Sequence, residues 1–299
     1  MKGFVFSTLI LVCGFTHAQQ DPLYSQYQFN QLMINPAYAG IYDRFSAGLI
    51  SRYQWAGIEG APVTNTLTVQ SALKYGKIGI GGVLLNDRFG ISDNYELQIS
   101  GSYNVLMQDA KLAFGLQGEL IRHGFNLNNL ELDFLDDPEV LNVPQSFQKP
   151  NFGIGVMHLR EKFFIGASVP RILNVNESDG LIKSERYRKL YYFTGGFVFS
   201  ANELIKLKTV SMIRSIAGQT ISFDLLVSAN LDEIFRTGVS IRDFQEFGLF
   251  ANMLVAKRLR LGYSFELPAN SLIRGSYGTH EISVSIDFGV NGNKMERYF

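Results

Sequence analysis

The chain has 299 residues, a formal net charge of zero at pH 7 and 13% aromatic residues, and its mean hydropathy is +0.05. The balanced charge gives no electrostatic basis for nucleic-acid binding. The only cysteine, Cys13, lies in the N-terminal apolar stretch, so disulfides, cysteine metal sites and a thiol nucleophile are excluded from the rest of the chain.

The first 18 residues have the pattern of a secretory signal peptide. Lys2 precedes an apolar stretch over 4–15, and Thr16-His17-Ala18 supplies a small residue before the cut. We predict cleavage after Ala18, so that the mature chain begins at Gln19. Val12 is not the small residue that a lipoprotein cut needs, so no lipid anchor is expected. No later stretch approaches 18 apolar residues, so the sequence predicts no transmembrane helix.

Residues 19–40 are predicted to form a short helical segment that plugs the lumen of a barrel or docks at its periplasmic face. Asp21-Pro22 is a helix start, and Asn35-Pro36 ends the helix before an extended 37–40. A disordered lead-in is the alternative. The polar and aromatic candidates for plug or partner binding are Asp21, Pro22, Tyr24, Ser25, Gln26, Tyr27, Asn30, Asn35, Pro36, Tyr38 and Gly40.

From residue 41 to 299 the chain is predicted to form an all-β fold, a transmembrane antiparallel β-barrel of about 14 strands. The evidence is a series of segments in which apolar and polar residues alternate, as in Glu281-Ile282-Ser283-Val284-Ser285-Ile286-Asp287-Phe288. An even count closes an antiparallel barrel. The expected strands are 41–53, 63–73, 77–87, 91–106, 110–123, 150–159, 161–171, 186–200, 204–217, 219–230, 235–242, 246–255, 258–267 and 279–290.

The lengths of the connections favour the same fold. If the N-terminus is periplasmic, the even-to-odd connections should be short turns and the odd-to-even connections longer outer loops. The long connections, 54–62, 124–149, 172–185 and 268–278, all fall on the outer side. A pair of soluble β-sandwiches is the alternative fold, but it gives no reason for this sorting. Gly76 and Gly79 to Gly82 are interpreted as easing barrel curvature rather than as a phosphate loop.

Several motifs occur in a recognisable order along the mature chain. They are Asp21-Pro22-Leu23-Tyr24-Ser25-Gln26-Tyr27, Asn35-Pro36-Ala37-Tyr38-Ala39-Gly40, Arg52-Tyr53-Gln54-Trp55-Ala56-Gly57, Gly60-Ala61-Pro62-Val63-Thr64, Asn86-Asp87-Arg88-Phe89-Gly90, Pro150-Asn151-Phe152-Gly153 and Gly278-Thr279-His280-Glu281-Ile282. With them the chain resembles the PorP/SprF family.

The resemblance implies an integral outer-membrane protein of the type IX secretion system of Bacteroidota, in contact with outer-membrane lipid. It also implies association with the ring lipoproteins of that system and support for export or surface attachment of large adhesin cargo, including gliding adhesins. No cofactor and no enzymatic activity are implied. The alternative function is a gated outer-membrane channel for a small solute, with 19–40 as the gate. An outer-membrane enzyme finds no support beyond separate serines and histidines.

The outer loops contain further candidates for partner binding. Trp55, the sole tryptophan, is interpreted as a membrane-rim anchor or, alternatively, as a partner contact. The acidic loop 124–149 matches no calcium loop and is expected to be solvated. His123, His158 and His280 lie on separate segments without metal-ligand spacing. The outer-loop candidates are Arg52, Gln54, Trp55, Gly57, Pro62, Phe134, Asp136 and Asp137.

Overall fold

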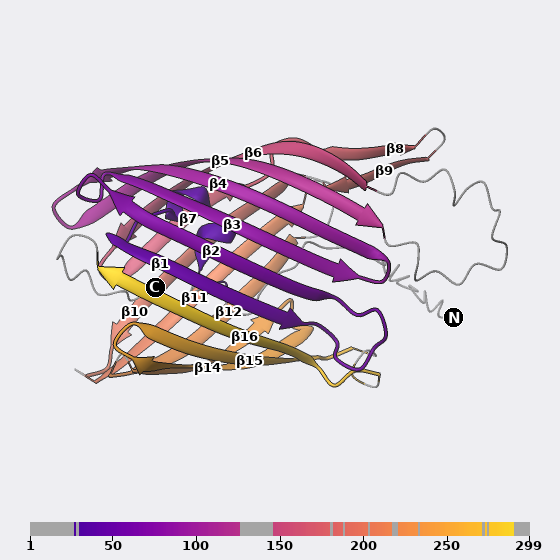
Figure 1. Cartoon of the computed structure of the whole chain (residues 1–299). Helices are drawn as coiled ribbons and strands as arrows, with labels where there is room; N and C mark the ends of the chain where they lie inside the picture. Colours follow the sequence, from indigo (N-terminus) through magenta and orange to yellow (C-terminus); the bar gives the residue numbers. More distant parts are fainter. Residues whose placement is uncertain are drawn as a thin grey trace, which may run out of the picture.

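The computed structural model describes residue 27 and residues 30–125, 146–179, 182–187, 189–202, 204–216, 221–232, 234–270, 273 and 275–289. Fourteen strands form one closed antiparallel barrel, in which β1 pairs with both β2 and β16 (Figure 1). The barrel strands are β1 (Arg44–Tyr53), β2 (Val63–Leu73), β3 (Ile78–Phe89), β4 (Ser92–Leu106), β5 (Ala110–Phe125), β6 (Ser146–Arg160), β7 (Phe163–Val169), β10 (Leu190–Ser200), β11 (Ile205–Ile216), β12 (Ile221–Leu231), β13 (Phe235–Arg242), β14 (Glu246–Ala256), β15 (Leu259–Pro268) and β16 (Thr279–Gly289).

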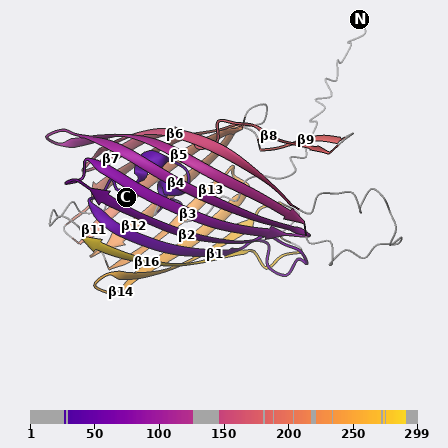
Figure 2. The same ribbon diagram turned by 45° about the horizontal axis from the view of Figure 1, so that its top comes forward.

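The predicted barrel is confirmed, and each predicted strand lies within four residues of an observed one. The prediction missed a hairpin of β8 (Val175–Asp179) and β9 (Ile182–Tyr187), which pair as a separate two-stranded sheet. This hairpin extends past the end of the barrel in Figures 1 and 2. The predicted strand 186–200 began too early, because its first residues belong to β9.

Alternation along the strands separates a lipid-facing surface from the lumen. In β4, Tyr95, Leu97 and Ile99 are 37–66% exposed, whereas Glu96 and Gln98 are almost completely buried. Exposed side chains in this barrel are therefore mostly apolar and face outward, and buried polar side chains face inward. This is the reverse of a soluble fold and is typical of a membrane barrel.

The two ends of the barrel differ in their connections. Short turns such as the one after β2 lie at one end, and the loops 54–62 and 269–278 lie at the other. Outer-membrane barrels have short periplasmic turns and longer outer loops. We therefore name the end that contains Tyr75 periplasmic and the end that contains Trp55 outer.

The N-terminal segment differs from the predicted helix followed by extended chain. In its described part it forms two 3₁₀ turns, η2 (Gln31–Met33) and η3 (Pro36–Tyr38). The expectation that 37–40 is extended is wrong, because Asn35 starts a new turn. Its side-chain oxygen accepts the N–H of Ala37 at 2.9 Å, and Pro36 occupies the first turn position. No helix in the part of the chain that the structure describes could cross a membrane.

Candidate functional site

The N-terminal segment lies inside the barrel. We call Tyr27 together with residues 30–43 the lumen segment. Its two turns are visible within the ring of strands in both Figures 1 and 2. Its apolar residues, each at most 7% exposed, are Tyr27, Leu32, Ile34, Ala37, Tyr38, Ala39, Ile41 and Tyr42. The predicted site residues Asn30, Asn35, Pro36 and Gly40 lie in the same segment.

Polar side chains of the barrel wall bind the backbone of the lumen segment. The hydroxyl of Ser168 donates to the Ile34 carbonyl at 2.6 Å, and that of Ser102 donates to the Ala39 carbonyl at 2.7 Å. The Gly40 N–H donates to the side-chain oxygen of Gln70 at 3.2 Å. These contacts come from β7, β4 and β2, so they hold the segment across a wide arc of wall. They supply partners that a buried, irregular backbone needs.

Two of the predicted asparagines also bind the wall. The Asn30 amide donates to the hydroxyl of Thr68. The Asn35 amide donates to the Val156 carbonyl at 3.2 Å, while its oxygen caps η3. Asn35 therefore fixes the local turn and the position of that turn on β6 with one side chain.

Glycines on the inner face of the wall make room for the lumen segment. We call Gly79, Gly81, Gly115 and Gly155 the glycine bed. A Cβ at Gly79 would overlap the Ala39 carbonyl, and one at Gly115 would overlap the backbone at Pro36 and Ala37. At Gly81 it would meet Leu32, and at Gly155 it would overlap Asn35.

Close approach of the lumen segment therefore explains Gly79 and Gly81 better than the curvature that the sequence suggested. Gly115 and Gly155 were not predicted from the sequence as part of this site. The sequence does contain one indication of the glycine bed: Gly79 and Gly81 are two residues apart, so they lie on the same face of β3. That pattern does not say which segment the face contacts.

Apolar side chains from both sides of the barrel complete a core within the lumen. Large inward side chains from several strands join the lumen segment in one cluster. They include Met157, Phe164, Tyr192, Val198, Val210, Met212, Leu226 and Phe250. Burying a large aliphatic or aromatic side chain stabilises a fold by about 1.5–3 kcal/mol. The main apolar core of this protein thus contains the lumen segment and joins the walls formed by β3–β7 and β10–β14.

A buried ion pair fixes the lumen segment where it enters β1. The ammonium of Lys111 donates to the Ile41 carbonyl at 2.8 Å and pairs with the Asp43 carboxylate at 2.7 Å. Both side chains are under 10% exposed. Asp43 has a φ of +50°, and a Cβ at Gly76 would overlap its carboxylate. The turn into β1 is therefore determined by side-chain contacts on β5 and by a glycine in the next turn.

Buried ion pairs line the outer half of the lumen near β1. Arg52 lies 2.8 Å from Glu266 and 3.3 Å from Glu281. The prediction of Arg52 as an outer-loop residue is wrong, because it lies within β1 and its side chain is 2% exposed. Alternation along β1 turns it inward, where carboxylates of β15 and β16 compensate its charge. It is not accessible to a partner at the surface.

Further arginine–carboxylate contacts lie on both sides of the lumen. Arg242 contacts Asp224 at 2.9 Å on β12. Arg171, which follows β7, contacts Glu96 at 2.6 Å and Glu119 at 2.9 Å. These charges are buried and paired, as buried charges must be.

Tyr27, at the start of the lumen segment, lies near the charged residues in the outer half of the lumen. Burial raises the pKa of its phenol, and nearby Asp224 raises that pKa further, whereas Arg242 lowers it. The phenol is therefore neutral at physiological pH. Its electrostatic neighbours lie on β12 and β13, opposite the glycine bed on β3, β5 and β6, so the segment crosses the lumen between the two walls.

The first outer loop, residues 54–62, has a defined conformation held by backbone hydrogen bonds. Its ends meet through a hydrogen bond from the Gln54 N–H to the Pro62 carbonyl at 2.9 Å. Ala56 exchanges two backbone hydrogen bonds with the last outer loop, at 2.8 Å to Gly278 and 2.7 Å to Tyr277. These hydrogen bonds close the loop on itself and join it to the loop before β16.

Three residues of this loop, Trp55, Gly57 and Gly60, have a positive φ. Trp55 has a φ of +47°, and its N–H donates to the Thr279 hydroxyl at 3.2 Å. Gly57 has a φ of +93°, and a Cβ there would lie 2.5 Å from the Tyr277 ring. Trp55 is half-buried. The predicted candidates Gln54, Trp55, Gly57 and Pro62 therefore form one rim with the loop before β16.

The remaining predicted site residues lie outside the described part of the chain. They are Asp21, Pro22, Tyr24, Ser25, Gln26, Phe134, Asp136 and Asp137. The predicted signal peptide also lies there, as does most of the acidic loop.

The histidines do not converge on a metal site. His123 contacts Asn94 inside the barrel, and His280 contacts the Tyr263 hydroxyl at 2.7 Å on the outside. Among the residues that the structure places, no group of three or more histidine, cysteine or acidic side chains could hold a metal ion.

Comparisons with known proteins found similar solved structures and one family model. Three solved structures are similar: the Acinetobacter baumannii outer membrane protein Omp33 (8% identity, 84% of this chain and 99% of that one, TM-score 0.49), the CymD monoaromatic hydrocarbon channel (11%, 86% and 91%, 0.49) and a Pseudomonas aeruginosa FadL homologue (10%, 86% and 93%, 0.47). No curated protein matches. The family model of the type IX secretion system membrane protein PorP/SprF matches residues 16–286, so the chain belongs to this family of secretion-system membrane proteins, not enzymes, and is an outer-membrane β-barrel.

Proposed function

We propose that this barrel binds adhesin cargo, the periplasmic ring lipoproteins of the type IX secretion system, or both, and so supports export or surface attachment of the cargo. The observation that carries the proposal is the packed lumen segment. A barrel whose lumen holds an apolar core is poorly suited to pass a solute, so its ends and loops are the surfaces left for function.

The two ends offer different contacts. The outer rim presents Tyr277, which is 79% exposed, beside the shaped loop 54–62. The periplasmic end presents Tyr75, which is 86% exposed, in the turn after β2. Tyrosine is enriched at protein interfaces, because a rigid amphipathic ring gives large contact area at little entropic cost. We assign cargo to the outer rim and ring lipoproteins to the periplasmic turns.

Site-specific photo-crosslinking in cells tests this assignment. A p-benzoylphenylalanine at Tyr277, at Tyr75 or at the lipid-facing Ile99 is activated, and adducts are identified by mass spectrometry. We expect a large adhesin from position 277, a ring lipoprotein from position 75 and neither from position 99. Ile99 is a matched control, because it is 66% exposed but faces the membrane. Equal adducts at all three positions, or none at 277 and 75, would contradict the proposal.

A gated channel for a small solute is the second candidate. The specific observation in its favour is the lumen lining of buried charged residues such as Arg52 and Glu119. To conduct a solute, the barrel would have to release the lumen segment from the glycine bed.

A further inference from the structure

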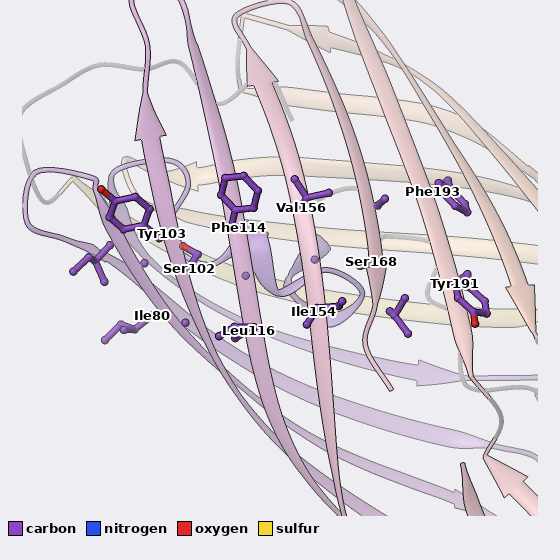
Figure 3. A pocket seen from close by; sticks show the side chains of 17 residues that line it. Ile80, Ser102, Tyr103, Phe114, Leu116, Ile154, Val156, Ser168, Tyr191 and Phe193 are labelled. Carbon is purple, nitrogen blue, oxygen red and sulfur yellow. The ribbon is translucent and has the colours of Figure 1, made fainter. Parts of the chain in front are cut away.

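The outer surface of the barrel carries an apolar groove of about 800 Å³ across β3–β7 and β10. Figure 3 shows the side chains of Tyr103, Phe114, Val156 and Phe193 in a row over neighbouring strands. The register confirms this row, because Tyr103 pairs with Phe114, Phe114 with Val156, and Val156 and Phe193 both with Ala167. A groove of this size is within the range of small-molecule sites.

Small residues make the groove. Ala167 interrupts the row of large side chains, and Gly101 interrupts the row beside it. A Cβ at Gly101 would meet nothing within 4 Å, so space is open above it. Gly115 and Gly155 of the glycine bed also line the groove. The groove therefore lies directly behind the lumen segment, with one layer of backbone between them.

The position of the groove on the lipid-facing surface indicates which kind of molecule covers it. Phe114 is 50% exposed, and Leu116 and Ile154 beside it are 69% and 47% exposed, on the face that a membrane barrel turns to lipid. The strands that form the groove pair with both neighbours, so they offer no free edge to a partner strand. Hydrocarbon chains are the occupant that fits an apolar groove without free backbone groups.

The groove has a cationic end at the periplasmic side. The outward row of β6 continues from Val156 through His158 to Arg160, about 13 Å along the strand. The Arg160 guanidinium lies 5.8 Å from the centre of the Phe163 ring, and the His158 ring lies 5.9 Å from it. Lys162 in the same turn is exposed, as is Glu161 between the two cations. An arginine held over a ring is pre-positioned for an anion.

A second pair of cations, both lysines, lies beside the groove. Lys77 precedes Ile78, which lines the groove, and Lys77 and Lys74 are both exposed in the turn after β2. Four cations thus lie at the periplasmic ends of β3 and β6 against two exposed carboxylates, Asp109 and Glu161, while the groove itself is apolar. This division matches an amphiphile with hydrocarbon chains and an anionic headgroup.

We propose that the groove binds an anionic phospholipid of the periplasmic leaflet, with its acyl chains over Gly101 and Ala167 and its phosphate headgroup at Arg160 and Lys162. Charge complementarity selects this occupant. A lipid without a net negative headgroup would use only the groove, and a lipidated partner without a phosphate would leave the cations unpaired. The inference does not depend on the function proposed above.

Native mass spectrometry of the purified full-length barrel tests the site. The probes are phosphatidylglycerol and phosphatidylcholine with the same acyl chains. We expect one phosphatidylglycerol to bind about tenfold more tightly than phosphatidylcholine, because a charge-assisted contact favours the anion. The double variant Arg160→Gln/Lys162→Gln should bind both lipids equally and weakly. Filling the groove with Gly101→Leu/Ala167→Leu should remove retention of both.

A matched variant separates a site from general adhesion of lipid. Arg258 lies 4.9 Å from the Phe288 ring at another periplasmic turn, and Ala251 is a small outward residue on β14. The double variant Arg258→Gln/Ala251→Leu should bind phosphatidylglycerol as the native protein does. Equal retention of the two lipids by the native protein would overturn the proposal. So would lipid loss in this control matching that in the groove variants, or unchanged retention after the groove is filled.

Discussion

At the scale of single residues, the glycine bed determines whether the lumen segment can sit in the barrel. Gly115 shows this most clearly, because Pro36 and Ala37 pack their backbone where its side chain would be. Serines and Gln70 then bind the segment by hydrogen bonds that require this close approach. The fit of the lumen segment therefore depends both on wall positions that lack a side chain and on the side chains that bind it.

Gly115→Val should displace the lumen segment while leaving the barrel folded. The reason is that valine would overlap the backbone of η3, whereas β-branched residues favour strands. The measurement uses Ile34→Cys, because Cys13 lies in the predicted signal peptide and the mature chain would otherwise lack cysteine. Ile34 is 5% exposed, so maleimide labelling should be slow in the parent and at least about tenfold faster with Gly115→Val.

Gly118→Val on the same strand is the control, because a Cβ there meets nothing within 4 Å. It should leave labelling of the cysteine introduced at position 34 slow. Fast labelling in both variants would mean that valine disturbs β5 itself, and slow labelling in both would mean that the segment does not depend on the glycine bed.

At the scale of elements, the pairing of β1 with β16 closes the barrel. Arg52 connects three adjacent strands through Glu281 on β16 and Glu266 on β15. Removing one member of a buried ion pair leaves an uncompensated charge, which costs about 3–5 kcal/mol. Arg52→Met should therefore lower the guanidinium concentration that half-unfolds the barrel, read as the gel shift between folded and unfolded forms.

Arg88→Met supplies the comparison for the Arg52 variant. Arg88 contacts Asp93 at 3.2 Å, but both side chains are well exposed, and such pairs contribute only about 0–1 kcal/mol. Its midpoint should stay close to that of the native protein. Adding Glu281→Gln to Arg52→Met should recover part of the loss, since one of the two carboxylates that Arg52 compensates is then neutral. Equal midpoints for the Arg52 and Arg88 variants would show that burial does not strengthen this pair.

The sequence predicted the strands well, because each alternates between lipid and lumen over its whole length, as Tyr95 to Ser100 do. It left open whether residues 19–40 plug the lumen or dock at its periplasmic face, and it did not predict their turns. These turns depend on Asn35, which bonds both to Ala37 and to β6 more than a hundred residues away. Arg52 falls within the predicted strand 41–53 but was named as an outer-loop partner candidate; its buried partners, Glu266 and Glu281, are too distant in sequence to be recognised there. The missed β8–β9 hairpin pairs only with itself and carries no barrel pattern.

At the scale of the whole molecule, the interior of the barrel contains two regions of opposite polarity. The lumen segment and the walls form an apolar core, while the outer half holds paired charges such as Arg171 with Glu119. A soluble protein would place the apolar set inside and the charges outside. Here lipid covers the exterior, so the charges can only lie within the lumen or at the ends.

Deleting residues 19–40 should convert the barrel into a conducting pore. The native protein in a planar bilayer should show no steady single-channel current, because Leu32, Tyr38 and their neighbours fill the lumen. Without them the inward polar residues of β2 and β4 would face water. Leu32→Ala/Tyr38→Ala should give brief openings, since losing such buried groups costs about 2–5 kcal/mol each. A steady native current would favour the solute channel, and a deletion variant that folds but does not conduct would show that the lumen segment is not what closes it.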